Sequence, residues 1–322
     1  MSRFDTLVRV SRLYYELDET QGRIAEIVGL TRPQVSRLLK QARAEGIVEI
    51  RIVDRTSQGS SAEEALVGRF RLRAAHLAPT VVGPEELTRR SVGRLAAQVF
   101  VAEVRDGMIV GVGDGSAVSA TTDALDAVAT PIGATIVPLC GGFWFGGAAR
   151  EPYRRVADAL GATAHPLLAP GLLEDAATRD GLYGHLGVRG VRDLWDRLDV
   201  ALFGIGGPSW TEAQVGAPIM RELADAGAVG EVLIAPLDID GHFVAEDLRS
   251  RVIAFDARSL GRVPVSIAVA SGPAKVAPIL AALRAGVVTT LVTDVRTAEA
   301  IVRLDETTGS GARGQGGSGA PR

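Results

Sequence analysis

The feature that most restricts the fold of this chain is a series of short runs that are apolar at nearly every position, each separated from the next by sequence of helical character. Strands of this kind are buried on both faces, as in a parallel sheet whose connecting helices cover both sides. The sequence therefore predicts an α/β domain with a largely parallel sheet. The predicted strands are Met108–Val112, Thr135–Leu139, Val200–Ile205, Val232–Ala235, Val265–Ala270 and Thr289–Val292.

The N-terminal part of the chain has a different pattern. Apolar residues recur at helical spacing over Phe4–Leu17, and two further helices are expected at Gln21–Val28 and Arg32–Ala44. Glu45-Gly46 then interrupts the helical pattern, and Ile47–Val53 alternates as a strand does. Helix, helix, turn, helix and strand in this order are typical of a winged helix-turn-helix.

The composition changes between these two regions. The chain has 322 residues, which is long enough for two domains. Residues 56–61 are polar and rich in serine and glycine, as is typical of a linker. Glycine, serine and alanine dominate the sequence after Glu306, so that part is expected to be disordered. The sequence thus predicts a helix-turn-helix domain at 1–55, a linker at 56–61, an α/β domain at 62–306 and a disordered tail at 307–322.

Four residues of the helix-turn-helix segment meet separate steric requirements. Ala25 is small where two helices cross, Gly29 suits a left-handed turn, and Val35 and Leu38 hold the second helix against the first. Thr31 is a suitable cap for the helix that follows it. A generic three-helix bundle with a solvated polar face would not need all of these spacings at once, which favours a DNA-binding motif.

Positive charge is concentrated on the third predicted helix. The whole chain has a formal net charge of −3, and between Arg32 and Arg43 there are four basic residues and no acidic one. A basic helix face fits the major groove of DNA and its flanking phosphates. The expected DNA contacts come from Thr31, Arg32, Gln34, Ser36, Arg37, Lys40 and Arg43.

Other features bear on the compartment. The single cysteine, Cys140, cannot form a disulfide within the chain, and the charged N-terminal sequence lacks the apolar stretch of a signal peptide. No stretch approaches the roughly 18 uninterrupted apolar residues that indicate a membrane span. We therefore expect a soluble protein of the reducing cytoplasm, with no membrane partner.

Glycine-rich turns follow two of the predicted strands, at Gly113–Ser116 and at Ser271–Lys275. Backbone N–H groups at the start of a helix attract anions, and parallel sheets bind ligands beyond the carboxyl ends of their strands. We therefore expect a ligand between these two turns, with Lys275 contacting an anionic group. The alternative for Lys275 is an exposed position on the helix surface.

Motifs along nearly the whole chain, from about Phe4 to Glu306, point to one known family. They are LVRVSRLYYEL and AEIVGLTRPQVSRLLKQARAEGIVEI, followed by GVGDGSAV, PLCGGF, ALFGIGG, GAVGEV, DIDG and AVASGPAKVAPILAALRAGVVTTLVTDVRTAEAI. This set resembles the SorC family of sugar-responsive bacterial regulators. The resemblance implies an effector domain folded like ribose-5-phosphate isomerase and glucosamine-6-phosphate deaminase. It also implies a phosphorylated sugar bound without turnover, and dimers or tetramers whose operator binding responds to that effector.

Further candidate effector contacts lie outside the two turns. Glu231, by resemblance, is a stronger candidate than Asp238 for accepting the hydroxyl groups of a sugar, as carboxylates do. Asp240, which precedes a glycine, fits a turn better than a ligand contact. For the glycines after other strands, close approach to a ligand and tight turning are equally good explanations. The expected effector-binding residues are Gly113, Asp114, Gly115, Ser116, Gly141, Gly142, Arg150, Gly204, Gly206, Glu231, Asp238 and Lys275.

The sequence departs from the family pattern near the expected phosphate. Asp114 and Ala117 stand where the family loop has tryptophan and threonine, which places a carboxylate beside the phosphate and removes a hydroxyl donor. Arg150 stands where family members often have asparagine, and an arginine can grip an anion through two hydrogen bonds. We therefore expect a retained pocket whose effector is a phosphorylated sugar or a related polyol.

A sugar-phosphate isomerase or deaminase is the alternative from another functional class. Such an enzyme needs a general acid and base above the sugar carbons. The histidines, which are scattered and lack the spacing of metal ligands, are His76, His165, His185 and His242. We therefore expect no catalytic residue, no bound metal and no cofactor.

Overall fold

The computed structural model describes residues 3–48, 59–142, 151–207 and 215–312. Two compact units make up the chain, Met1–Ser57 and Gln58–Arg322. Within the described ranges, no helix combines the length and the hydropathy needed to cross a membrane.

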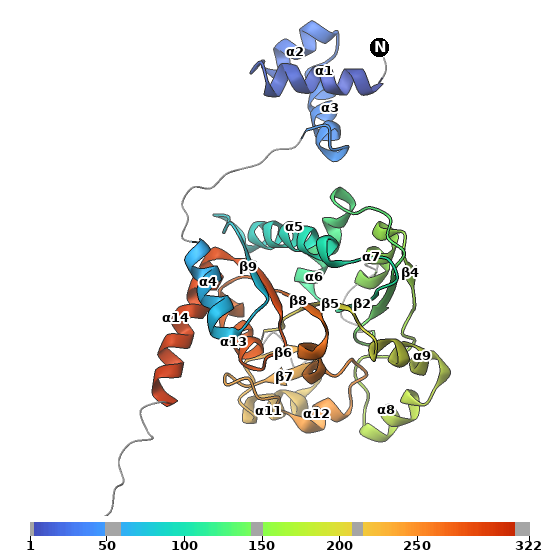
Figure 1. The fold of residues 1–322 in the computed structure, drawn as a ribbon, viewed down its shortest axis with the longest axis vertical. Coiled ribbons are helices and arrows are strands. Elements are labelled where there is room, and N and C mark those ends of the chain that lie inside the picture. Colours follow the sequence, from blue (N-terminus) through green and yellow to red (C-terminus); the bar gives the residue numbers. More distant parts are fainter. Residues whose placement is uncertain (1–2, 49–58, 143–150, 208–214, 313–322) are drawn as a thin grey trace, which may run out of the picture. The chain divides into compact units, whose positions relative to one another are not determined.

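The described residues of the first unit form three helices, α1 (Arg3–Tyr15), α2 (Gln21–Val28) and α3 (Arg32–Ala44) (Figure 1). Their apolar positions meet in a small core made of Val10, Ile24, Ala25, Val35 and Leu39. The first helix ends two residues earlier than expected. Ile47 and Val48 are not in a strand, and residues 49–53 of the predicted wing lie outside the described residues, so the wing stays a prediction.

The second unit is built on a seven-stranded parallel sheet, which confirms the predicted fold class. The spatial order of its strands is β1-β9-β8-β5-β2-β3-β4. Their bounds are β1 (Ala74–Ala78), β2 (Ile109–Val112), β3 (Thr135–Pro138), β4 (Thr163–Ala164), β5 (Val200–Gly204), β8 (Val265–Val269) and β9 (Thr290–Asp294). The edge strand β1 and the short β4 were not expected from the sequence.

Helices cover both faces of the sheet (Figure 1). Val200 and Leu202 of β5 pack with helices on one face, whereas Ala201 and Phe203 pack with helices on the other, which explains why the strand is apolar throughout. The first face carries α5 (Glu85–Glu103), α6 (Ser116–Asp123) and α7 (Pro152–Leu160). The second face carries α4 (Gly59–Phe70), α9 (Leu186–Trp195), α13 (Val276–Arg284) and α14 (Val295–Ala312).

One predicted strand of the sheet was wrong. Instead of a parallel strand at Val232–Ala235, the chain forms an antiparallel hairpin of β6 (Gly230–Val232) and β7 (Ala235–Leu237), separate from the large sheet. Leu233 and Ile234 form its turn, with φ of 49° and 66°. The run is apolar because this turn is buried in the core. Shorter elements complete the unit: α8 (Ala176–Tyr183), α11 (Ala217–Asp225), α12 (Glu246–Ser250), and the 3-10 helices η1 (Leu125–Ala127), η2 (Ala257–Arg262) and η3 (Pro273–Lys275).

Both ends of the second unit are more helical than the sequence indicates. Helix α4 begins at Gly59, inside the expected linker 56–61, because Ala62 and Leu66 are buried in the core. Helix α14 continues through 307–312, where a disordered tail was expected. Arg284 holds this part of α14, since its guanidinium donates hydrogen bonds to Asp305 at 2.9 Å and to Thr308 at 2.6 Å. Residues 313–322 lie outside the described residues.

Candidate functional site

The turn between α2 and α3 is fixed by local hydrogen bonds. The Thr20 hydroxyl oxygen accepts the N–H of Arg23 at 3.2 Å and thereby caps α2. Gly29 ends that helix in the left-handed region with φ of 69°, where glycine carries no steric penalty. The Gln34 side-chain oxygen accepts the N–H of Thr31 at 2.8 Å at the start of α3. The capping predicted for Thr31 therefore involves its backbone and Gln34.

The outward face of α3 presents most of the predicted DNA-contacting side chains to solvent. Ser36 is half-buried, and the exposed residues are Thr31, Arg32, Gln34, Arg37, Lys40 and Arg43. Arg37 and Lys40 are three positions apart, so they are neighbours on the helix surface. Val35 and Leu39 anchor the opposite face in the core. The helix is thus held by apolar contacts and offers a basic surface, as a recognition helix requires.

A second candidate site is a cavity of about 1010 Å³ at the carboxyl ends of the parallel strands, called the strand-end cavity below. Loops that follow β1, β2, β3, β5 and β8 line it, together with the end of β9 and the start of α14. Strands β2 and β5 lie side by side, and the strand order runs in opposite directions from this pair. Ligands of open α/β sheets bind at such a switch point.

Most of the predicted effector-binding residues line this cavity. They are Gly113, Asp114, Gly115, Ser116, Gly141, Gly142, Gly204, Gly206, Glu231 and Lys275. Two predicted residues are not among them. Asp238 does not line the cavity, and Arg150 lies outside the described residues.

Asp114 uses its carboxylate within the glycine-rich turn. Its Oδ1 atom accepts the backbone N–H of Gly115 at 2.6 Å, and the Asp114 side chain is otherwise exposed to the cavity. Gly115, with φ of 120°, immediately precedes α6. An N–H group at this helix start is therefore already bonded to an anion that belongs to the chain.

Gly206 is small because another chain segment crosses it. Its N–H donates to the carbonyl oxygen of Glu231 at 2.9 Å, and the N–H of Glu231 donates back at 3.1 Å. A Cβ atom at position 206 would stand 2.3 Å from the Cγ atom of Glu231. The close neighbour of Gly206 is Glu231 of the same chain, which is neither the ligand nor the tight turn that the sequence left open, and Glu231 itself lines the cavity.

Lys275 ends the 3-10 helix η3 and is half-buried beside the cavity. Burial lowers the pKa of Lys275 below its ordinary value, whereas the negative charge of Glu231 opposes this shift. Its ammonium group is therefore a partly desolvated donor near a carboxylate, and the alternative of a freely exposed surface lysine does not apply.

Cys140 also lines the cavity, a position that was not predicted for it. Burial, followed by the negative charges of Asp114 and Glu231, raises the pKa of its thiol to about 12. The thiol therefore stays protonated at neutral pH, and both carboxylates are close enough to act on it.

A buried carboxylate joins two of the loops that surround the cavity to the start of α14. Asp294, at the end of β9, accepts the hydroxyl of Thr80 at 2.5 Å and also accepts the hydroxyl of Thr297. The Thr297 hydroxyl oxygen in turn accepts the N–H of Gly272 at 2.9 Å. Because Asp294 is only 1% exposed, it positions the loops rather than a ligand. The sequence signal for Asp294 was a charged residue at the end of an otherwise apolar strand.

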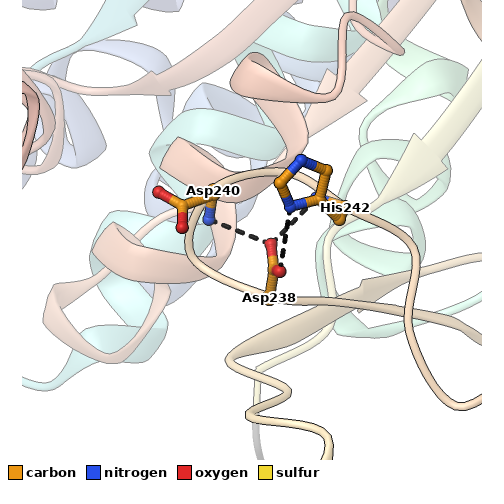
Figure 2. A group of neighbouring side chains, drawn as sticks. All are labelled: Asp238, Asp240 and His242. Carbon is orange, nitrogen blue, oxygen red and sulfur yellow. Dashed lines mark hydrogen bonds and ion pairs between the residues drawn. The ribbon is translucent and has the colours of Figure 1, made fainter. Parts of the chain in front are cut away.

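Asp238 has a structural role in a turn, together with Asp240 and His242 (Figure 2). Its Oδ1 atom accepts the N–H groups of Asp240 at 3.0 Å and His242 at 2.8 Å, and Oδ2 lies 3.1 Å from Nδ1 of His242. Burial raises the pKa of Asp238, but hydrogen bonds from His242 outweigh this and keep it below its usual range. These three side chains could reach one metal ion, yet the turn already uses the Asp238 oxygens.

Comparison with known proteins agrees with both sites. Residues 54–303 match the family of sugar-binding domains, and residues 5–57 match the Crp-like helix-turn-helix domain. The chain is 29% identical to the sorbitol operon regulator of Klebsiella pneumoniae, over 92% of this chain and 97% of that protein. This chain belongs to the SorC family. It is a transcriptional regulator with a domain of the sugar-binding family.

Other relatives resemble this SorC-family regulator along similar lengths. The erythritol catabolism regulatory protein EryD of Brucella abortus is 27% identical, over 92% of this chain and 95% of that protein. The crystal structure of the full-length sorbitol operon regulator SorC from K. pneumoniae superposes with a TM-score of 0.74 and 28% identity, covering 94% of this chain and 99% of that one. The similarity therefore includes both units of the chain.

Proposed function

We propose that this regulator binds operator DNA through the exposed face of α3, and that a small sugar-like effector in the strand-end cavity controls this binding. The observation that carries the proposal is the convergence of Asp114, Glu231 and Lys275 on one cavity at the switch point of the sheet. Carboxylates accept and ammonium groups donate the hydrogen bonds that sugar hydroxyls form. The roles proposed for individual α3 residues rest on their exposure and charge.

The names of two relatives support the class of effector. One regulates a sorbitol operon and the other regulates erythritol catabolism, and both compounds are polyols. For the present chain the proposed class comprises sugars, polyols and their phosphate esters.

The experiment that tests this function couples DNA binding to effector binding. Operator fragments are first selected from random DNA by the full-length protein. Fluorescence anisotropy then measures operator affinity with and without a panel of sugars, polyols and sugar phosphates. We expect at least one compound to bind the protein and to change operator affinity by at least about fivefold, the low end of typical allosteric coupling. Non-operator DNA is the control, and compounds that bind in the cavity without altering operator affinity would contradict the proposal.

A further inference from the structure

At two helix starts around the strand-end cavity, one backbone N–H group is bonded to a side chain of this protein. At the start of α6, Asp114 Oδ1 takes the N–H of Gly115 at 2.6 Å. Ahead of η3, the Thr297 hydroxyl takes the N–H of Gly272 at 2.9 Å. A phosphate that binds at helix starts needs such N–H groups to be available, because their aligned dipoles and donors hold the anion.

The charged side chains in the described part of the cavity lining do not favour an anionic ligand. Among the described lining residues other than the buried Asp294, four are acidic (Glu85, Asp114, Glu151, Glu231) and three are basic (Arg89, Lys275, Arg296), and Glu151 pairs with Arg154. Arg89 forms an ion pair with Glu86, and the charge of Glu231 acts on Lys275. The positive charge that faces the cavity is thus partly neutralised by the chain itself.

The repulsion between the cavity and an anionic ligand should be strongest at Asp114. The carboxylate and the amide that it caps belong to the same turn, so a phosphate placed on this turn would face a like charge at short range. Like charges a few ångströms apart in a partly desolvated site repel strongly. A carboxylate has a second oxygen and further lone pairs, which suit the hydroxyl donors of an uncharged ligand.

We infer that the strand-end cavity selects an uncharged polyhydroxylated effector, a sugar or polyol without a phosphate ester, and that Asp114 sets this preference. Asp114 fills the amide position that a ligand phosphate would take and offers its free oxygen to a hydroxyl group. Glu231 and Lys275 supply further hydrogen bonds to the remaining hydroxyl groups. This inference rests on the proposed function, since it names the chemical class of the effector of the same cavity.

The test compares matched ligands on the full-length protein by calorimetry at constant ionic strength. The pairs are erythritol and erythritol 4-phosphate, sorbitol and sorbitol 6-phosphate, and ribose and ribose 5-phosphate, and inorganic phosphate is a separate probe of the turn. The variants are Asp114→Asn, which removes the charge but keeps an oxygen for Gly115, and Asp114→Ala, which also removes the oxygen. Asp126→Asn is the matched control, because Asp126 is an exposed carboxylate that does not line the cavity.

We expect the wild-type protein to bind the neutral member of any pair that it recognises at least tenfold more tightly than the phosphorylated member. Asp114→Asn should reduce this preference at least tenfold, while Asp126→Asn retains it. Inorganic phosphate should bind Asp114→Ala at least tenfold more tightly than wild type. Thermal unfolding of each variant confirms that it is folded.

Two results would overturn the inference. One is a wild-type preference for the phosphorylated member of a pair. The other is inorganic phosphate binding that is the same in wild type and Asp114→Ala, a result that decides the matter even if no pair binds. Failure of the proposed function has a different signature: a ligand binds with the expected preference, but operator affinity does not change.

Discussion

Glu231 lies directly across Gly206, so that a Cβ atom at position 206 would stand 2.5 Å from the Oε1 atom of its carboxylate. The backbone bridge between these two residues holds the hairpin strand β6 against the loop that follows β5. Because Gly206 has no side chain, the Glu231 carboxylate can take its place in the cavity lining.

Gly206→Ala should displace Glu231 and weaken both folding and effector binding. Overpacking of this kind costs about 1–3 kcal/mol of unfolding free energy. Denaturant unfolding and calorimetry measure the two effects. The matched control is Gly190→Ala, since Gly190 lies outside the cavity and a Cβ atom there meets no atom within 4 Å, so this change should lower neither stability nor effector affinity. Equal stability of the two variants would contradict the role of Gly206.

Arg37→Ala and Lys40→Ala should each weaken operator binding by about 1–3 kcal/mol if the lost contact is to a base edge. Both side chains are exposed on α3, and neither is part of the apolar core of the first unit. Arg303→Ala is the control, because Arg303 is an exposed arginine on α14 that pairs with Glu299. Anisotropy titration against the selected operator is the measurement. Wild-type affinity in both α3 variants would remove the assignment of α3 as the recognition helix.

We also expect a homo-oligomer, a dimer or a tetramer. One helix-turn-helix reads a single half-site, and symmetric pairing of two units doubles the contacts on a palindromic operator. Light scattering at micromolar concentration, with and without operator DNA, gives the mass directly. A monomer under both conditions would contradict this prediction.

Much of the fold could be predicted because its strands are apolar on both faces, as in Val200–Gly204 and Val265–Val269. The hairpin at Gly230–Leu237 could not, since a buried turn and a buried strand have the same hydropathy and only the positive φ of Leu233 and Ile234 separates them. The same limit applies to the site. The glycine-rich turns that follow strands could be recognised in the sequence, because each lies within one short segment. The contact between Asp294 and Thr80 could not, because these residues are 214 positions apart and meet only in the folded chain.

Cys140 makes the stability of the protein sensitive to alkaline pH. Its folded-state pKa of about 12 lies above the ordinary value of 9.0, so the unfolded chain loses this proton first. The stabilisation is complete below about pH 9 and is lost as pH rises toward 12, by up to about 1.4 kcal/mol per pH unit. Cys140→Ser should lose less stability than wild type between pH 9 and 10.5 in denaturant unfolding. If the unfolding free energies of the two proteins depend on pH in the same way, Cys140 is not buried beside the charges of Asp114 and Glu231.

The chain has two lysines, Lys40 on α3 and Lys275 beside the strand-end cavity. Substituting each one tests DNA binding and effector binding separately. Lys275→Ala should reduce effector affinity by about 1.5–3 kcal/mol, the range for hydrogen bonds to charged groups, and leave operator affinity unchanged without effector. Lys40→Ala should do the reverse, so each variant is the control of the other. Because burial lowers the pKa of Lys275, effector affinity should also fall as pH rises in the alkaline range below 10.5. Lys275→Ala should lack this decline, and calorimetry of both variants across that range measures it. If Lys275→Ala binds effector as tightly as wild type at neutral pH, the effector does not occupy the strand-end cavity beside η3.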